Sequence, residues 1–177
     1  MTELRTARLV LRRWRPQDEP PMTAINRDPE VQRYLNRPVG EAALAAFLPS
    51  VREHWERHGF GLYAVESREP AERRQLLGFA GVAYPTFLPQ LAERPEIGWR
   101  LARRAWGRGL ATEAALAVRA HAFGTLALPE LISIVHPENA RSQRVATKLG
   151  MTVERQVWHA QLRRFVDVWA LPAAPAG

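Results

Sequence analysis

Apolar residues in the first half of the chain change between the alternating spacing of strands and the three-to-four spacing of helices. In residues 41–58, for example, Leu44, Leu48, Val51 and Trp55 recur at helical intervals. The predicted elements are a strand at 9–14, a short helix at 17–26 interrupted by Pro20 and Pro21, a turn at 29–35, a helix at 41–58 with a kink at Pro49, and strands at 60–66 and 76–84.

Strands and helices alternate in the second half. The predicted elements are a strand at 95–101, an alanine-rich helix at 112–123, a buried strand at 131–135, a helix at 139–149 that stops at Gly150, and a hairpin of 151–158 with 165–171. The alternation implies a βαβα unit, and the hairpins imply antiparallel edges. The predicted fold class is therefore α/β, a single mixed sheet with helices on both faces. We expect one domain over residues 1–171 and a flexible tail over 172–177.

Composition narrows the class of protein. The 177 residues suit one domain, with 46% apolar and 24% charged residues. No apolar run approaches the roughly 18 residues of a membrane span, and residues 1–5 are not followed by the apolar stretch of a signal peptide. The absence of cysteine excludes disulfides, thiolate metal sites and a covalent cysteine mechanism. These features favour the cytoplasm.

The net charge of +7 and the pI near 11.0 raise the question of an anionic partner. Of the 25 basic residues, all except Lys148 are arginine. They are scattered along the chain among 18 acidic residues and form no block. We therefore interpret the basic residues as a solvated surface, and we do not expect direct binding to nucleic acid.

The segment from Glu96 to Glu113 carries the strongest chemical signal, a strand followed by a basic loop and the start of a helix. Gly107 and Gly109 allow a tight turn, and the first amides of the next helix lack internal partners. Such a helix start attracts a phosphate or pyrophosphate, and Arg103, Arg104 and Arg108 would add positive charge at the mouth. The segment alone fits an anion site and an ordinary glycine turn equally well.

Two common phosphate motifs do not fit. A P-loop requires a Gly-Lys-Ser/Thr ending, which the chain lacks. A dinucleotide fingerprint requires a third glycine where this chain has Thr112, and an acid after the next strand where it has His136.

The loop resembles that of the GNAT acetyltransferase superfamily, in the branch related to ribosomal-protein N-terminal acetyltransferases. The family motif Gln/Arg-x-x-Gly-x-Gly/Ala matches the frame 106–111, with Trp106 in place of the first residue, and also a second frame that begins at Arg104. The opening Thr6-x-Arg8-Leu9-x-Leu11-Arg12 and the segment from Val135 to Gly150 extend the resemblance over most of the chain. The resemblance implies a splayed, mostly antiparallel sheet and acetyl-CoA as co-substrate.

We prefer the first frame because it places Trp99 and Leu101 where relatives pair with pantetheine. By this resemblance Asn139 would bond the pantetheine arm and Ser142 would lie near the thioester sulfur, although helix capping alone also explains an asparagine there. The implied acetyl-CoA-binding residues are Trp99, Arg100, Leu101, Trp106, Gly107, Arg108, Gly109, Leu110, Ala111, Thr112 and Asn139.

The resemblance also suggests catalytic roles for Glu96 and Ser142. Glu96 stands where relatives place a carboxylate that deprotonates the amine through water, although a glutamate at a strand start is also commonly just solvated. Gly98 could form a bulge that separates the strands, or leave room for a large neighbour. The tyrosine that many relatives use as an acid corresponds to Ala146 here, so the identity of the general acid stays open.

Several alternatives remain. The amine acceptor could be a protein N-terminus or a small amine such as a polyamine or antibiotic, and a non-catalytic acyl-CoA-binding regulatory module is a third interpretation. We expect no metal, because the five histidines share no ligand spacing, and we interpret His136 as a surface or packing residue. Arg144 and Lys148 lie one turn apart and could reach a coenzyme phosphate, but we interpret them as part of a solvated helix face. A homodimer is common among relatives, and the sequence leaves the oligomeric state open.

Overall fold

The computed structural model describes residues 3–35, 40–72 and 74–174. Within them, eight strands form one sheet in the order β1-β2-β3-β4-β5-β6-β8-β7. The strands are β1 (Leu4–Arg5), β2 (Leu9–Arg12), β3 (Leu62–Ser67), β4 (Leu76–Ala83), β5 (Glu96–Leu101), β6 (Glu130–Val135), β7 (Thr152–His159) and β8 (Arg164–Pro172). Neighbouring strands are antiparallel except β5 and β6, which are parallel. The predicted mixed α/β sheet is therefore confirmed.

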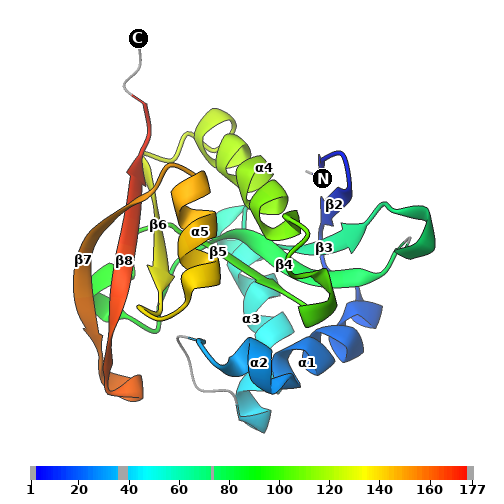
Figure 1. The fold of residues 1–177 in the computed structure, drawn as a ribbon, viewed down its shortest axis with the longest axis horizontal. Helices are drawn as coiled ribbons and strands as arrows, with labels where there is room; N and C mark the ends of the chain where they lie inside the picture. Colours follow the sequence, from blue (N-terminus) through cyan, green and yellow to red (C-terminus); the bar gives the residue numbers. More distant parts are fainter. Residues whose placement is uncertain (1–2, 36–39, 73, 175–177) are drawn as a thin grey trace.

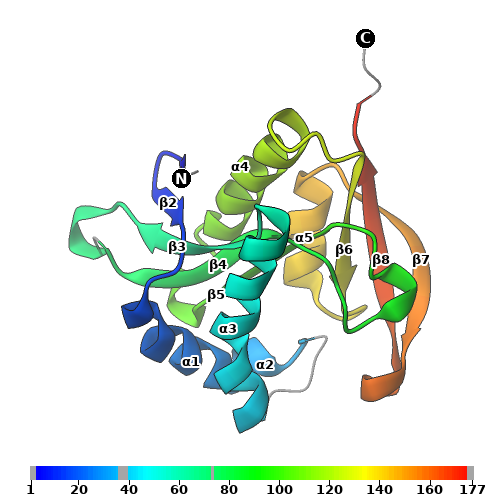
Figure 2. The same ribbon diagram turned by 180° about the vertical axis from the view of Figure 1, so that it is seen from behind.

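Helices cover both faces of the sheet. The α-helices are α1 (Glu19–Arg27), α2 (Pro29–Gln32), α3 (Glu41–His58), α4 (Leu110–Gly124) and α5 (Ala140–Lys148), and short 3-10 turns are η1 (Pro16–Asp18), η2 (Pro70–Glu72), η3 (Pro89–Leu91), η4 (Arg103–Ala105) and η5 (Ala160–Leu162). Figure 1 shows α4 and α5 side by side on one face, and Figure 2 shows α3 across the other. Because both faces are covered, every residue of β3 is buried, and β4 is buried up to its last residue.

Alanine brings α4 close to the sheet. Ala114, Ala115 and Ala122 are fully buried in the main core, where α4 contacts β4 and β5. Small side chains allow this close approach, and only a short connection separates the end of β5 at Leu101 from the start of α4 at Leu110. No helix in the described ranges is both long and apolar enough to cross a bilayer.

The prolines of α1 correct one prediction. Pro20 and Pro21 do not interrupt the helix, because they lie in its first turn, where an amide has no intrahelical partner to lose. Helix α3 has the predicted bounds, and it continues through Pro49, which lies in its interior.

The ends of the chain also differ from expectation. β2 ends at Arg12, short of the predicted Trp14, and the two-residue β1 was not predicted because so short a strand has no readable period. At the other end, Pro172 still belongs to β8 and Ala173 donates its N–H to the carbonyl of Pro129 at 2.9 Å. The predicted tail thus begins within a strand, and residues 175–177 lie outside the described residues.

Candidate active site

A cavity of about 600 Å³ lies between the end of β5 and the starts of α4 and α5. It brings together residues that are far apart in the sequence. Of the residues predicted for the site, those that line it are Trp99, Arg100, Leu101, Trp106, Gly107, Gly109, Leu110, Ala111, Thr112, Asn139 and Ser142. Glu96 and Arg108 are not among the lining residues.

The cavity exists because β5 and β6 diverge. The two strands pair at Glu96 and Ile132, and the register ends there, whereas β5 pairs with β4 as far as Leu101. Ala102 donates its N–H to the carbonyl of Leu77 on β4 at 2.7 Å. Since backbone groups alternate along an antiparallel ladder, the amides of Trp99 and Leu101 point away from β4 and into the gap. The amide of Arg100 points toward β4, so two of the three predicted backbone amides face the cavity.

The predicted bulge at Gly98 is absent. Gly98 pairs with Gly81 in a continuous register, and the irregularity in this part of the sheet lies instead between Val65 and Glu66 on β3. A Cβ atom built on Gly98 would meet no atom within 4 Å, so the glycine does not make room for a large neighbour either. The strands therefore separate without any help from Gly98.

The start of α4 presents unpaired backbone donors to the cavity. Gly109 is the N-cap with a φ of 75°, a conformation that favours glycine, and no side chain caps the helix. The first intrahelical bond is from the N–H of Glu113 to the carbonyl of Gly109, at 3.0 Å. The amides of residues 110–112 therefore lack intrahelical partners, and the helix dipole adds partial positive charge. This combination is suited to an anion.

Contacts with the N-terminal segment hold this loop from outside the cavity. The carboxylate of Glu113 accepts hydrogen bonds from the hydroxyl of Thr6 at 2.6 Å, and from the N–H and Nε of Arg8 at 2.9 and 2.7 Å. Arg8 Nη1 also donates to the carbonyl of Arg108 at 2.9 Å. Burial opposes the charge on Glu113, but the hydrogen bonds from Thr6 and Arg8 outweigh it and lower the pKa of the carboxyl. Sequence reasoning missed these contacts, although Thr6 and Arg8 stand in the opening motif.

The three arginines predicted at the mouth have other partners. Arg108 forms ion pairs with Glu69 and Glu72 at 2.7 and 2.9 Å, and its hydrogen bond lowers the pKa of Glu72. Arg104 donates to the carbonyl of Leu76 at 2.8 Å, and Arg103 lies 3.7 Å from Asp28. Among the described residues, the cationic side chains that do line the cavity are Arg33, Arg100, Arg141, Arg144 and Lys148. Arg144 and Lys148 are exposed, as expected for a solvated helix face, and they also line the cavity, so a contact of either one with a coenzyme phosphate stays a prediction.

Trp106 forms part of the cavity wall. Its indole Nε1 donates to the carbonyl of Leu101 at 2.8 Å, and the guanidinium of Arg141 lies 4.5 Å above its ring. Arg104 does not line the cavity. These placements favour the motif frame that begins at Trp106 over the frame that begins at Arg104.

At the start of α5, Asn139 acts as the N-cap. Its side-chain oxygen accepts the N–H of Ser142 at 3.1 Å, and Ala140 donates its N–H to the carbonyl of Glu138 at 2.9 Å, so two first-turn amides of this helix are satisfied by the protein itself. The side-chain NH₂ of Asn139 carries two further donors, and both Asn139 and Ser142 line the cavity. Ala146, the position of the relatives' tyrosine, is fully buried.

Glu96 lies at the closed end of the gap. It is half-buried at the first position of β5, where β5 still pairs with β6. Trp99 follows three residues later, about 10 Å along the strand. A carboxylate at that distance contacts a group bound beside Trp99 only through water or through a second bound molecule.

His136 lies next to the cavity. Its Nδ1 accepts the N–H of Glu138 at 3.0 Å, and its ring lies 5.0 Å from the ring of Tyr34, which lines the cavity. Burial lowers the pKa of His136, and the positive charge of Arg164 lowers it further. Both effects favour the neutral ring, and because Nδ1 accepts a hydrogen bond, the proton of the neutral ring is on Nε2. The described residues include no group of three or more histidine, aspartate or glutamate side chains able to hold a metal ion.

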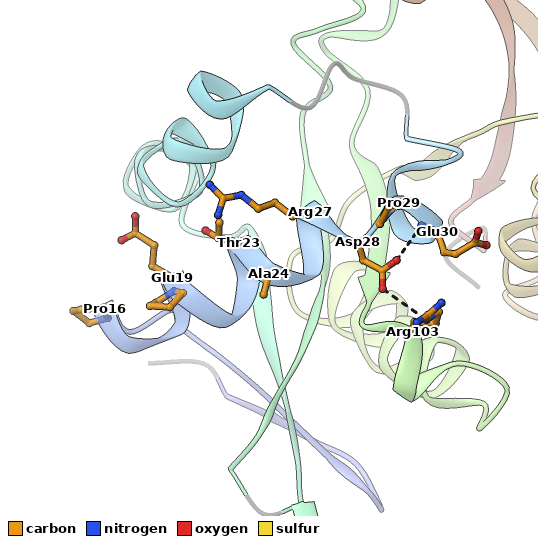
Figure 3. A pocket seen from close by; sticks show the side chains of 10 residues that line it. Pro16, Glu19, Thr23, Ala24, Arg27, Asp28, Pro29, Glu30 and Arg103 are labelled. Carbon is orange, nitrogen blue, oxygen red and sulfur yellow. Dashed lines mark hydrogen bonds and ion pairs between the residues drawn. The ribbon is translucent and has the colours of Figure 1, made fainter.

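A second, more open cavity of about 1140 Å³ lies over α1 and α2. Figure 3 shows Asp28 at one end of it, bonded to the N–H of Glu30 at 2.9 Å and paired with Arg103. Glu30 lines both cavities. None of the residues predicted for catalysis or coenzyme binding lines this second cavity, so the candidate active site is the cavity beside β5.

Comparisons with known proteins agree with this arrangement. Residues 8–152 match the family described as "Acetyltransferase (GNAT) domain". The uncharacterized N-acetyltransferase YoaA of Bacillus subtilis is 29% identical over 154 residues, which are 85% of this chain and 83% of YoaA. The crystal structure of an acetyltransferase from Agrobacterium tumefaciens has a TM-score of 0.83 and 28% identity, covering 97% of this chain and 94% of that one.

A more distant structure is similar in fold alone. RimL, a ribosomal α-N-protein acetyltransferase solved in complex with coenzyme A, has a TM-score of 0.76 at 14% identity, covering 97% of this chain and 98% of its own.

Proposed function

The chain belongs to the GNAT acetyltransferase family, and from this premise we propose that it transfers an acetyl group from acetyl-CoA to the α-amino group of a protein N-terminus. The observation that carries the proposal is the open start of α4. Its N-cap, Gly109, has no capping side chain, and its first amides face the same cavity as the end of β5. This arrangement can hold a diphosphate at one end and an acyl-pantetheine arm along the strand.

The residues present fit acetyl-CoA. The amides of residues 110–112 would hold the diphosphate, supported by the cationic side chains of Arg141 and Arg144. The amides of Trp99 and Leu101 would pair with the pantetheine arm, and one of them would polarise the thioester carbonyl. Asn139 would bond the arm from the opposite side through its NH₂ group. Acetyl-CoA, when bound, supplies an activated acetyl thioester.

The residues of the chain itself would contribute proton transfer and hydrogen bonding to the reaction. An α-amino group has a pKa of about 7.7–8.0, whereas a lysine-type amine lies near 10.4. The α-amino acceptor therefore needs only modest help to become a neutral nucleophile, and Glu96 would take its proton through water. Ser142 would donate a hydrogen bond to the departing thiolate, which, with a thiol pKa of about 8.5, needs little acid assistance.

Two features support a protein N-terminus as acceptor. The distant structural neighbour RimL is described as an α-N-protein acetyltransferase, and a protein with a net charge of +7 would favour an anionic target such as a ribosomal complex. Both concern the acceptor only, and the coenzyme assignment does not depend on them.

Melting scans with acetyl-CoA, CoA and NAD test the donor. A ligand present at a hundred times its dissociation constant stabilises the folded state by about 2.7 kcal/mol. We expect acetyl-CoA and CoA to raise the melting temperature and NAD to leave it unchanged. If acetyl-CoA gives no shift, the proposed function is wrong.

Release of free CoA thiol tests the acceptor. Peptides with free N-termini are compared with the same peptides blocked by acetylation and with small amines such as polyamines. We expect turnover with the free peptides alone. Turnover with small amines alone would assign a small-molecule acceptor, and no turnover across a broad panel, despite acetyl-CoA binding, would favour a regulatory module.

The Glu96→Gln variant tests the base. A general base typically contributes a hundred- to ten-thousand-fold, so we expect a loss of that order in the transfer rate. The dissociation constant of acetyl-CoA should stay unchanged, because Glu96 does not line the cavity. Glu93→Gln, which changes an exposed glutamate three residues earlier, is the matched control. Equal turnover of the Glu96 variant and this control would remove Glu96 from the mechanism.

A further inference from the structure

The N-terminal segment is fastened to the glycine loop by a set of contacts that has no part in the cavity. We call residues 6–8 the N-terminal strap. Through Thr6 and Arg8 the strap makes hydrogen bonds to the carboxylate of Glu113 and to the carbonyl of Arg108. None of these three anchoring side chains, Thr6, Arg8 and Glu113, lines the cavity. The strap therefore contacts the glycine loop from outside the cavity.

The bond to the Arg108 carbonyl fixes the direction of one peptide unit. In a trans peptide the carbonyl of one residue and the N–H of the next point in opposite directions. Arg8 Nη1 holds the Arg108 carbonyl at 2.9 Å on the outer side of the loop. The N–H of Gly109 must then point to the other side, which is the side of the cavity that Gly107 and Gly109 line.

The peptide needs such an anchor because its neighbours are permissive. Rotation of this peptide changes ψ of Arg108 and φ of Gly109, and glycine, here at a φ of 75°, adopts positive and negative φ at similar cost. The side chain of Arg108 is itself held by Glu69 and Glu72. Arg8 and these two glutamates thus hold the backbone and the side chain of the same residue.

Arg8 also offsets a charge that would otherwise disfavour an anion. Glu113 lies in the first turn of α4, where its carboxylate would repel a phosphate at the helix start. The guanidinium of Arg8 lies 2.7 Å from that carboxylate, and the side chain of Glu113 is only 18% exposed. The pair is therefore close to neutral, and it leaves the helix start attractive to anions.

We propose that Arg8, oriented by Glu113, is a positioning residue for the coenzyme diphosphate, which directs the N–H of Gly109 into the cavity without touching the ligand itself. This inference rests on the proposed function, since it assumes that acetyl-CoA occupies the cavity.

The test compares two ligands that differ in the diphosphate. Titrations of the full-length protein measure the dissociation constants of acetyl-CoA and of S-acetylpantetheine, which lacks the diphosphate and the adenosine. In Arg8→Met we expect the constant for acetyl-CoA to rise by about ten- to a hundredfold, and the constant for S-acetylpantetheine to change by less than about twofold. Arg5→Met, at an exposed arginine of the neighbouring strand β1, is the matched control and should change neither constant.

A second variant separates positioning from simple electrostatics. Glu113→Gln removes a negative charge next to the helix start, so charge alone predicts tighter binding of acetyl-CoA. Positioning predicts weaker binding, because glutamine keeps one acceptor oxygen for Thr6 and the N–H of Arg8, whereas its Nε2 cannot accept the bond from Nε of Arg8. We expect weaker binding, with unchanged affinity for S-acetylpantetheine.

The results distinguish failure of the positioning role from failure of the proposed function. Tighter binding in Glu113→Gln, unchanged acetyl-CoA binding in Arg8→Met, or an equal loss for both ligands would overturn the positioning role while leaving the proposed function intact. If the wild-type protein does not bind acetyl-CoA, the proposed function and this inference are both wrong.

Discussion

Two helices start at the same cavity, and they start differently. α4 begins at Gly109, with a left-handed backbone and no capping side chain. α5 begins at Asn139, whose side-chain oxygen accepts the N–H of Ser142 at 3.1 Å. Both helix starts carry a dipole and first-turn amides without intrahelical partners, but in α5 the amides of Ala140 and Ser142 are paired with Glu138 and Asn139. The choice of N-cap residue decides how many of those amides stay available to a ligand.

Because their N-caps differ, we expect the two helix starts to have different roles in ligand binding. An asparagine cap stabilises its helix by about 1 kcal/mol relative to alanine, and it uses up a donor in doing so. Glycine leaves the donors open, and at Gly109 it also permits a φ of 75°. We therefore expect α4 to hold the charged end of a ligand through its backbone, and α5 to contribute through the side-chain NH₂ of Asn139.

The largest expected effect comes from closing the start of α4. In Gly109→Val a β-branched residue is forced into the left-handed region, and its Cβ would lie 3.7 Å from Nη2 of Arg8, so both the loop backbone and its anchor must shift. We expect the dissociation constant of acetyl-CoA to rise at least about a hundredfold, equivalent to the loss of about 2.7 kcal/mol. Isothermal titration measures it directly.

Gly59→Val is the matched control for this variant. Gly59 follows α3 with the same φ of 75°, has no atom within 4 Å of a built Cβ, and is not a lining residue of the cavity. Its substitution should cost similar backbone strain and leave acetyl-CoA binding unchanged. Normal affinity in Gly109→Val, or an equal loss in the control, would contradict the assignment of the loop.

The difference between the two helix starts could be read only partly from the sequence. Gly107, Gly109 and Asn139 could be placed because a strand, a short loop and a helix start follow one another within a few residues, so local spacing determines the geometry. The roles assigned to these residues remain predictions.

Contacts between distant segments could not be read in this way. Arg8 and Glu113 are separated by 105 positions and Arg108 and Glu69 by 39. In a chain with 25 basic and 18 acidic residues, no periodic pattern selects one ion pair from the many combinations.

The prediction that the prolines interrupt α1 failed for another reason. A proline breaks the interior of a helix but is tolerated in its first turn. An error of two or three residues in the predicted helix start therefore decides whether a proline is expected to break the helix or to begin it.

A smaller effect is expected at α5, where capping and ligand binding can be separated. Asn139→Ser keeps a side-chain acceptor at the N-cap, so the free energy of unfolding should change by only a few tenths of a kcal/mol. Serine lacks the NH₂ group, so the dissociation constant of acetyl-CoA should rise about tenfold. Chemical denaturation and titration measure the two quantities independently.

Asn139→Ala completes this experiment. Alanine removes the cap as well, and should cost about 1 kcal/mol of stability in addition to the loss of affinity. If Asn139→Ser binds acetyl-CoA like the wild type while Asn139→Ala is destabilised, Asn139 is a cap and nothing more.

The smallest expected effect concerns pH, because only one of the two helix starts contains a titrating group. Hydrogen bonds from Thr6 and Arg8 outweigh burial and lower the pKa of Glu113 below its ordinary value of 4.5. A carboxyl with a depressed pKa in the folded state stabilises the fold above pH 4.5, and this contribution is lost as the pH falls through the folded-state pKa.

Urea unfolding at pH 6 and at pH 4 and below tests this contrast. The wild type should lose more stability on acidification than Glu113→Gln, while Asn139→Ser should follow the wild type, because neither asparagine nor serine titrates in this range. The other carboxyls with a lowered pKa, such as Asp18, are present in all three proteins and cancel in the difference. Equal pH dependence of the wild type and Glu113→Gln would show that the strap contributes no charge-dependent stability, and that the open start of α4 is held by backbone geometry alone.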